Sequence, residues 1–182
     1  MRQLPTLKTG RLVLRPFLLS DAATVLRLAG DRAVADTTLS IPHPYVDGMA
    51  EQWIATHEGA WTRHEMATLA ITEAEAGLIG AISLRIELAH RRAELGYWIG
   101  VPYWGLGYAT EAARAMVAFG FEKLSLHRIY AHHFTRNPAS GRVMSKVGMR
   151  LEGTLRQHFF RWDRPEDVAA WGLLRTEVTG TG

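Results

Sequence analysis

The strongest constraint on the fold is a strand, a glycine turn and a helix that follow one another between residues 92 and 124. Residues 92–101 alternate between apolar and polar or small side chains, which predicts a strand with two different faces. Apolar or small residues then recur at helical spacing for four turns from Ala109 to Leu124, which predicts an amphipathic helix. Gly105 and Gly107 stand between the two elements, and both can adopt a positive φ that brings a ligand close to the main chain.

This turn would place several main-chain N–H groups at the start of a helix, where the dipole adds about half a positive charge. The sequence therefore predicts a site for an anionic group such as phosphate, although a tight turn alone would also explain a single Gly-x-Gly. Two common nucleotide motifs are absent. A dinucleotide fingerprint would have a third glycine at Thr110, and a P-loop would need Gly-Lys-Ser/Thr.

The remaining elements can be read from hydrophobic spacing and from turn residues. We expect further strands at 12–14, 66–72, 78–87, 128–134, 150–160 and 168–177, and further helices at 20–28, 49–61 and 138–147. Antiparallel strands come first and β-α-β-α alternation comes later, so we predict an α+β fold with a mixed, mostly antiparallel sheet of about seven strands and helices on both faces. At 182 residues the chain (1–182) is expected to form a single domain.

Composition excludes several classes of chemistry. The chain has no cysteine, which rules out disulfides, thiolate-bound zinc and a cysteine nucleophile. No apolar run approaches the roughly 18 residues of a membrane span and no signal peptide is recognisable, so we expect a cytoplasmic protein without a membrane partner. The net charge of +3 comes from scattered basic residues, so a nucleic-acid partner is not favoured.

Two motifs carry a resemblance to a known family. The stretch AELGYWIGVPYWGLGYATEA, followed about 20 residues later by HRIYAHHFTRNPASGRVMSKVGMRLEGTLR, resembles the GNAT superfamily of N-acetyltransferases, and within it the RimJ/RimL-like branch. The likeness is continuous from about Ala93 to Arg156, with weaker support from TGRLVLRPF near the start. Two motifs in the right order and at the right separation make a chance match improbable.

The resemblance implies acetyl-CoA as cosubstrate. Its pyrophosphate would be held by the main-chain amides of the loop and helix start, namely Trp104, Gly105, Leu106, Gly107, Tyr108, Ala109 and Thr110. Trp104 departs from the Gln or Arg that the family usually has there, and it could instead cover part of the cosubstrate. The family splays its strand before this loop, so the main chain of Ile99, Gly100 and Val101 would bond the pantetheine arm, as would Asn137.

The resemblance also suggests catalytic residues. Glu94, on the strand that leads to the loop, is the candidate base, acting directly or through a water; pairing with Arg91, Arg92 or a neighbouring strand is the alternative. Ser140 is the candidate group near the departing sulfur, since Met144 occupies the place of the tyrosine that many GNAT enzymes use. Ser140 could equally be a first-turn helix residue that bonds the backbone.

Other residues give weaker predictions. His132 and His133 are adjacent on a predicted strand, so they point to opposite faces and cannot share a metal. His57 and His64 lack a carboxylate that completes a ligand set, so we expect no metal. Trp53 and Trp61 are most simply interpreted as core residues, but they could also line an acceptor cleft.

The leading hypothesis is an acetyl-CoA-dependent N-acetyltransferase that works by direct attack in a ternary complex, because no cysteine can carry an acetyl intermediate. Branch likeness favours a protein N-terminal α-amine as acceptor, while amino acids, polyamines and antibiotics stay open. A non-catalytic acyl-CoA sensor and a basic nucleic-acid-binding module are the alternatives, and a homodimer is an open question.

Overall fold

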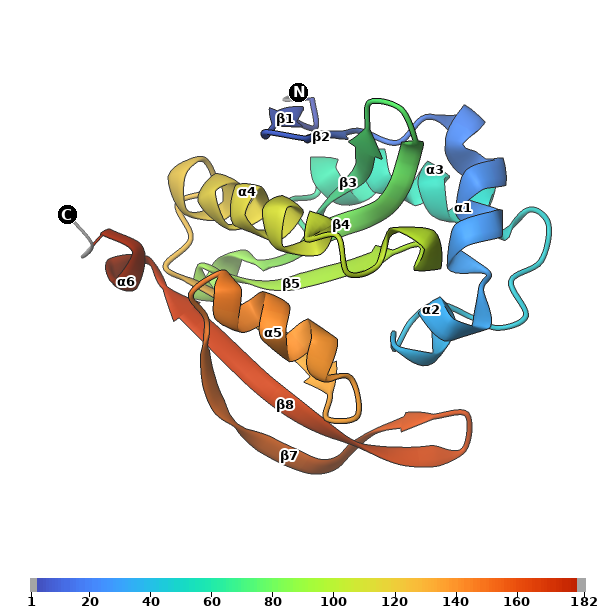
Figure 1. Cartoon of the computed structure of the whole chain (residues 1–182). Coiled ribbons are helices and arrows are strands. Elements are labelled where there is room, and N and C mark those ends of the chain that lie inside the picture. The colour runs from blue at the N-terminus through green and yellow to red at the C-terminus, as the bar shows by residue number, and fades with distance from the viewer. Residues whose placement is uncertain (1–2, 180–182) are drawn as a thin grey trace.

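The computed structural model describes residues 3–179 as an eight-stranded sheet flanked by helices (Figure 1). The strands are β1 (Leu7–Lys8), β2 (Leu12–Arg15), β3 (Met66–Glu73), β4 (Gly77–Glu87), β5 (Arg92–Ile99), β6 (Arg128–Phe134), β7 (Arg150–Arg161) and β8 (Arg164–Leu174). The helices are α1 (Ala22–Ala29), α2 (Arg32–Asp36), α3 (Met49–Thr62), α4 (Tyr108–Glu122), α5 (Pro138–Lys146) and α6 (Arg175–Thr179). The predicted α+β class and the mostly antiparallel sheet are confirmed. No helix in this part of the chain is both long and apolar enough to cross a membrane.

A wedge opens in the middle of the sheet, between β5 and β6. The strand order is β1-β2-β3-β4-β5-β6-β8-β7, and β5 and β6 are its parallel pair within residues 3–179. Their register joins only residues 92–94 of β5 to residues 128–130 of β6. Beyond Glu94, β5 continues to Ile99 paired with β4 alone. This divergence is the splayed strand that the family resemblance predicted.

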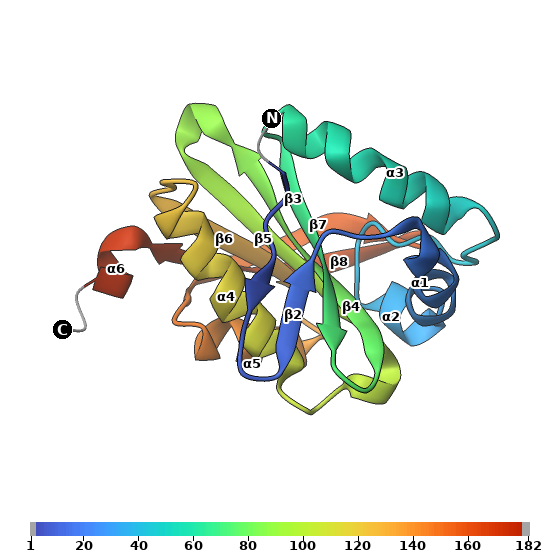
Figure 2. The ribbon, with the colours of Figure 1, turned by 90° about the horizontal axis from the view of Figure 1, so that it is seen from above.

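Helices cover both faces of the sheet. Figures 1 and 2 show α4 and α5 on one side of the strands and α1 and α3 on the other. Alternation along β4 explains this arrangement, because Leu84 belongs to the core cluster under α4 whereas Ala81 packs into the cluster under α1 and α3. Met116 of α4 and Val25 of α1 are almost fully buried, one in each cluster. Each helix is thus held by its apolar stripe.

The last predicted strand, 168–177, is wrong at both ends. The hairpin turns at Trp162 and Asp163, which have φ of 49° and 57°, so β8 already begins at Arg164. Pro165 is tolerated in the strand because β6 pairs with β8 only from Val168 onward. At the other end, helix α6 starts at Arg175 and shortens the strand.

Two short elements were not predicted. The two-residue strand β1 pairs with β2 and is the eighth strand of the sheet, where the sequence indicated about seven. Helix α2 has five residues, too few to show a helical period, and begins where the side chain of Asp31 accepts a hydrogen bond from the Ala33 amide. The predicted helix 20–28 begins instead as a 3₁₀ turn, Leu19–Asp21, before α1.

Candidate active site

The glycine loop presents a row of main-chain amides that the protein leaves free. Gly105 and Gly107 have φ of 76° and 83°, and α4 begins at Tyr108 without a side-chain cap. Within residues 3–179, the amides of residues 105–110 donate no hydrogen bond to the protein. A Cβ placed on Gly105 would meet nothing within 4 Å, so the approach to these amides is open. Free amides at a helix N-terminus fit a pyrophosphate.

The opposite side of this loop is tied down by Arg11, which the sequence analysis missed. The guanidinium of Arg11 donates to the carbonyl oxygen of Leu106 at 3.0 Å and pairs with Glu111 at 2.8 Å. It also lies 4.6 Å from the centre of the Tyr108 ring. These contacts join residues about 100 positions apart, so no local pattern could have indicated them. The loop is fixed through its carbonyls and side chains while its amides face outward.

The strand end before the loop is also partly engaged. The indole of Trp104 donates to the carbonyl oxygen of Ile99, and the amide of Gly100 donates to Ile79. The carbonyls of Gly100 and Val101 accept from amides of the following turn. The predicted pantetheine contact at Ile99, Gly100 and Val101 therefore stays a prediction. It could use only those main-chain groups of the three residues that are not already hydrogen-bonded within the protein.

A cavity of about 890 Å³ extends through the wedge and is lined from both faces of the sheet. From the face of α1 and α3 it is lined by Trp53, Glu94 and His132, and from the face of α5 by Tyr97, Ser140 and Met144. Residues 37–42, between α2 and α3, form another wall. The cavity is large enough for a small ligand. Two reactants could therefore meet in it from opposite faces of the sheet.

Glu94 faces His132 on the neighbouring strand. The Oε1 atom of Glu94 lies 3.0 Å from Nδ1 of His132, and the Glu94 side chain is 31% exposed. Of its predicted alternative partners, Arg92 pairs with Glu87 at 2.8 Å and Arg91 donates to a main-chain carbonyl, whereas the predicted alternative of a contact with a neighbouring strand is present, through His132 of β6. Glu94 is therefore a cavity carboxylate whose neighbour is a titratable imidazole.

His133 points away from its neighbour. Its Nδ1 lies 2.8 Å from the carbonyl oxygen of Phe134, and its other ring nitrogen lies beneath Gly141 of α5. The two adjacent histidines thus take opposite faces of β6, as predicted. No group of three side chains suited to a metal occurs in the described part of the chain.

Asn137 and Ser140 lie together at the N-terminus of α5. The Asn137 carboxamide oxygen accepts from the Ser140 amide, and its Nδ2 donates to Ser140 Oγ at 3.2 Å. This is the helix-cap role that the sequence left open for both residues. Ser140 also lines the cavity, whereas Asn137 does not. The pantetheine contact of Asn137 stays a prediction.

Tyr97 is a second hydroxyl at this place. Its oxygen is buried next to Ser140 but has no partner in good hydrogen-bond geometry within residues 3–179. Burial raises the pKa of Tyr97 to about 12, against a smaller opposing effect of the Ser140 hydroxyl. The phenol is therefore protonated at neutral pH. The alternation of the strand predicted only that Tyr97 would lie on its apolar face, so the sequence did not indicate a buried hydroxyl beside Ser140.

The tryptophans of α3 have different environments. Trp61 is 8% exposed within the core cluster, whereas Trp53 lines the cavity and packs edge-on against Phe17 and His57. His57 is buried among these rings without a hydrogen-bond partner in the described residues, and desolvation lowers its pKa to about 4. The His57 ring is therefore neutral at physiological pH and packs against the neighbouring aromatic rings.

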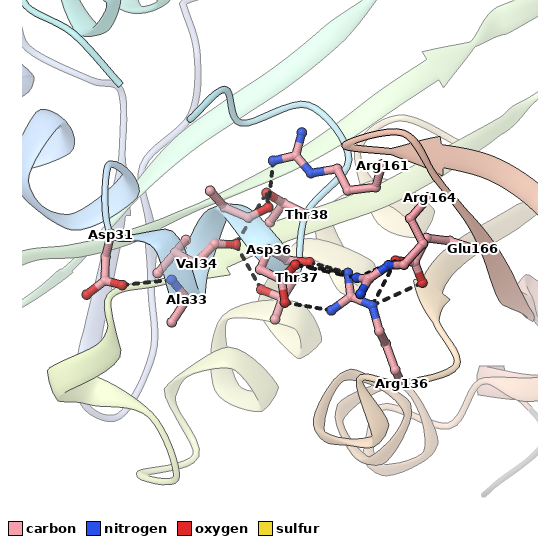
Figure 3. Close-up of polar contacts among 11 residues, drawn as sticks. Asp31, Ala33, Val34, Asp36, Thr37, Thr38, Arg136, Arg161, Arg164 and Glu166 are labelled. Carbon is pink, nitrogen blue, oxygen red and sulfur yellow. Dashed lines mark hydrogen bonds and ion pairs between the residues drawn. The ribbon is translucent and has the colours of Figure 1, made fainter. Parts of the chain in front are cut away.

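Arginines from the β7–β8 hairpin and from the end of β6 hold the wall formed by residues 37–42. Arg161 is 8% exposed, and its guanidinium donates to the carbonyl oxygens of Ala35, Leu39 and Ile41. Figure 3 shows Arg136 between Asp36 and Glu166, with ion pairs of 2.7 and 3.0 Å. Burial lowers the pKa of Arg161, with an opposing effect of Asp36. The hairpin therefore fixes one side of the cavity.

A mixed sheet split by a wedge, with free amides at the next helix, defines a class of enzyme that transfers an acyl group from a coenzyme A thioester. The family model of the acetyltransferase (GNAT) domain matches residues 11–150. The chain belongs to this family of acetyl-CoA-dependent N-acetyltransferases.

Several proteins are similar to this chain in sequence. The uncharacterized N-acetyltransferase p20 of Bacillus licheniformis is 31% identical over 96% of this chain and 99% of its own length. The spermidine N(1)-acetyltransferase of Vibrio cholerae is 27% identical over 92% of this chain and 95% of its own. The putative ribosomal N-acetyltransferase YdaF of Bacillus subtilis is 32% identical over 58% of each chain. Three relatives from Bacillus subtilis are matched over only 56% to 59% of their length.

Solved structures share the fold. A GNAT-family acetyltransferase from Bacillus anthracis has a TM-score of 0.84 and 26% identity, over 94% of this chain and 99% of its own. RimL, a ribosomal L7/L12 α-N-protein acetyltransferase crystallised with coenzyme A, has a TM-score of 0.86 at 17% identity, over 93% of this chain and 98% of its own. The second likeness supports the fold alone.

Proposed function

We propose that this protein transfers the acetyl group of acetyl-CoA to a primary amine, and that its preferred acceptor is the α-amine of a protein N-terminus. The observation that carries the proposal is the cavity through the wedge, which has Glu94 on one face of the sheet and Ser140 on the other. Direct attack in a ternary complex follows, because the chain has no cysteine to carry the acetyl group. We place the activity in the cytoplasm, as the sequence suggested.

The glycine loop would bind the donor. The amides of residues 105–110 would hold the pyrophosphate, since they have no partner in the protein and the α4 dipole favours negative charge. From there the pantetheine arm would run past Ile99, Gly100, Val101 and Asn137 into the wedge. This path brings the thioester into the cavity next to Ser140.

Glu94 would act as the base. The attacking amine must be neutral, and an α-amine is neutral in roughly one molecule in ten at pH 7, against about one in 2,500 for a lysine side chain. Glu94, with His132 at 3.0 Å, can take the proton that the nitrogen loses as it bonds to the thioester carbon, directly or through a water. The modest demand on the base favours an α-amine acceptor.

Ser140 and Tyr97 would stabilise the leaving sulfur. When the C–S bond breaks, the thiolate can accept a proton or a hydrogen bond from the Ser140 hydroxyl, which the protonated Tyr97 phenol adjoins. A thiol pKa near 8.5 makes the thiolate a fair leaving group unaided, so this contribution is expected to be small.

The test is thiol release from acetyl-CoA in the presence of peptides with free N-termini, free amino acids, polyamines and aminoglycosides. We expect turnover with α-amines and a large loss of kcat in Glu94→Gln. Acetylation of lysine side chains alone would contradict the α-amine preference. Saturable acetyl-CoA binding without transfer to any amine would show a sensor instead, and a full kcat for Glu94→Gln from pH 6 to 9 would remove its role as base.

A further inference from the structure

Among the described residues, the lining of the cavity includes one arginine, Arg85, one carboxylic acid, Glu94, and no lysine. Its other titratable residues, two histidines and two tyrosines, are weaker acids or bases, and the rest of the lining is neutral. Glu94 is the proposed base. Arg85 has no place in the mechanism above.

Arg85 lies directly across from Glu94. The two residues are Cα partners in the antiparallel register of β4 and β5, so their Cβ atoms are about 5 Å apart on the same face of the sheet. An arginine and a glutamate in this arrangement usually pair, but Glu94 is turned toward His132. Arg85 makes no ion pair or hydrogen bond within residues 3–179 through its side chain.

The neighbouring charges on this face are already matched. Glu87, two residues along β4, pairs with Arg92 at 2.8 Å and accepts a hydrogen bond from Tyr130. Arg85 is therefore an exposed cation that lines the cavity and forms no ion pair with an anion of the described residues. A planar guanidinium with five free donors is suited to a carboxylate.

We propose that Arg85 selects acceptors that carry an anionic group, most simply a carboxylate, close to the amine that is acetylated. This inference rests on the proposed function. With the amine at Glu94, the anion would lie about one cross-strand spacing away, at the Arg85 guanidinium. An amino acid offers its own α-carboxylate within this distance, and a protein N-terminus offers an acidic first or second side chain.

The same charges disfavour a polyamine. A polyamine carries several cations and needs several anions, whereas the cavity supplies one carboxylate and adds a cation beside it. Like charges at this separation repel each other, which lowers affinity. The acceptor class of this chain therefore differs from that printed in the name of its spermidine-acetylating relative.

The experiment compares matched acceptors in the thiol-release assay. One pair is an amino acid and its carboxamide, and the other is a set of peptides that differ only in Glu, Gln or Lys at position two. We expect kcat/KM for the carboxylate form to exceed that for the neutral form by on the order of tenfold, as a charge-assisted hydrogen bond would give. The pair that responds identifies the source of the anion.

Substitutions assign the effect to Arg85. Arg85→Gln should abolish the preference and leave the KM for acetyl-CoA unchanged, Arg85→Lys should keep part of it, and Arg85→Glu should favour the Lys peptide. Arg27→Gln is the matched control, because Arg27 is an exposed arginine on α1 that does not line the cavity. Preference for carboxylates that survives Arg85→Gln, or equal rates for both forms in the wild type, would overturn the inference. Absence of thiol release with every amine would instead refute the proposed function.

Discussion

The indole nitrogen of Trp104 lies 2.6 Å from the carbonyl oxygen of Ile99, so the start of the glycine loop is fastened to the end of β5. Trp104 is 45% exposed, which means that this bond, rather than burial, fixes its position. From the family resemblance we expected Trp104, in place of the usual Gln or Arg, to cover part of the cosubstrate, and that role stays a prediction. In this chain the tryptophan takes over a structural task, because it sets the angle at which the loop leaves the strand.

Replacing Trp104 with Phe should raise the KM for acetyl-CoA about fivefold, because one net hydrogen bond of about 1 kcal/mol is lost while the ring is kept. The value of kcat should change little, since the substitution does not touch the wedge. Steady-state kinetics with a saturating peptide acceptor will measure both constants. An unaltered KM would show that the loop holds its shape without this bond.

Replacing Gly105 with Ala should weaken coenzyme A binding. The residue has φ of 76° and open space around it, so the alanine is strained by about 1 kcal/mol through its backbone alone and would tend to rotate the free amides. Gly77→Ala is a matched control for the backbone strain, since Gly77 has φ of 69° and equally open space but lies in the β3–β4 hairpin, outside the row of free amides. Both variants should lose similar stability in denaturant, but calorimetry should show weaker binding only for Gly105→Ala. Equal affinities in the two variants would contradict the amide site.

Removing the Ser140 hydroxyl should lower kcat by on the order of tenfold, near the low end for a general acid. Tyr97→Phe should give a smaller loss, since that phenol would act through Ser140. The double variant should be little worse than Ser140→Ala, because the two hydroxyls serve the same sulfur. Pre-steady-state thiol release will separate chemistry from product release. If the losses of kcat in the two single variants were fully additive in the double variant, Ser140 and Tyr97 would not act on the same leaving sulfur.

His57 should make the protein less stable in mild acid. Its folded-state pKa of about 4 lies below the ordinary value of 6.5, so as the pH falls the unfolded chain takes up a proton that the folded protein does not. The free energy of unfolding should therefore decrease between pH 6.5 and 4, by up to about 3 kcal/mol, and this contribution should level off below pH 4. Urea titrations will measure it.

The comparison variant for this acid effect is His57→Phe, which fills the aromatic site without a titrating group and should flatten the profile in that window. His90→Gln removes an exposed histidine and should leave the profile as it is. An identical pH dependence in wild type and His57→Phe would show that other groups cause the acid loss.

Arg161→Met should loosen the wall of residues 37–42, because three main-chain carbonyls lose their donor. We expect the acceptor KM to rise several-fold while the KM for acetyl-CoA stays constant, since the glycine loop is elsewhere in the fold. Arg156→Met is the control, because Arg156 is an exposed arginine on β7 in the same hairpin and does not bond this wall. Equal effects on both KM values would show a general loss of folding.

Local patterns predicted the elements that carry the donor site. The four apolar turns of α4, the alternation of β5 and the Asn137-Pro138 start of α5 each lie within one stretch of chain, so their spacing is visible in the sequence. The family resemblance supplied the splay of β5, which the register then confirmed. Helix α2 escaped prediction because five residues are too few to define a period.

The contacts that complete the site could not be predicted in this way. Arg11 reaches the loop and Arg161 reaches residues 35–41 across more than 90 positions of sequence, and Arg85 meets Glu94 only through the register of two strands. A single sequence gives the type of each residue but not the partner that the folded sheet brings beside it. These long-range pairs include the proposed determinant of the acceptor.

Under the proposed function, acetyl-CoA and the acceptor amine would be bound by different parts of the protein, main-chain amides for the first and side chains for the second. At the loop, the candidate donor groups are main-chain amides, and side chains such as Trp104 and Arg11 hold the loop in shape. In the proposed acceptor site within the wedge, by contrast, side chains such as Glu94 and Arg85 would determine which amine binds. Substitutions at Arg85, opposite Glu94, should therefore change which amine is accepted without changing how acetyl-CoA is bound.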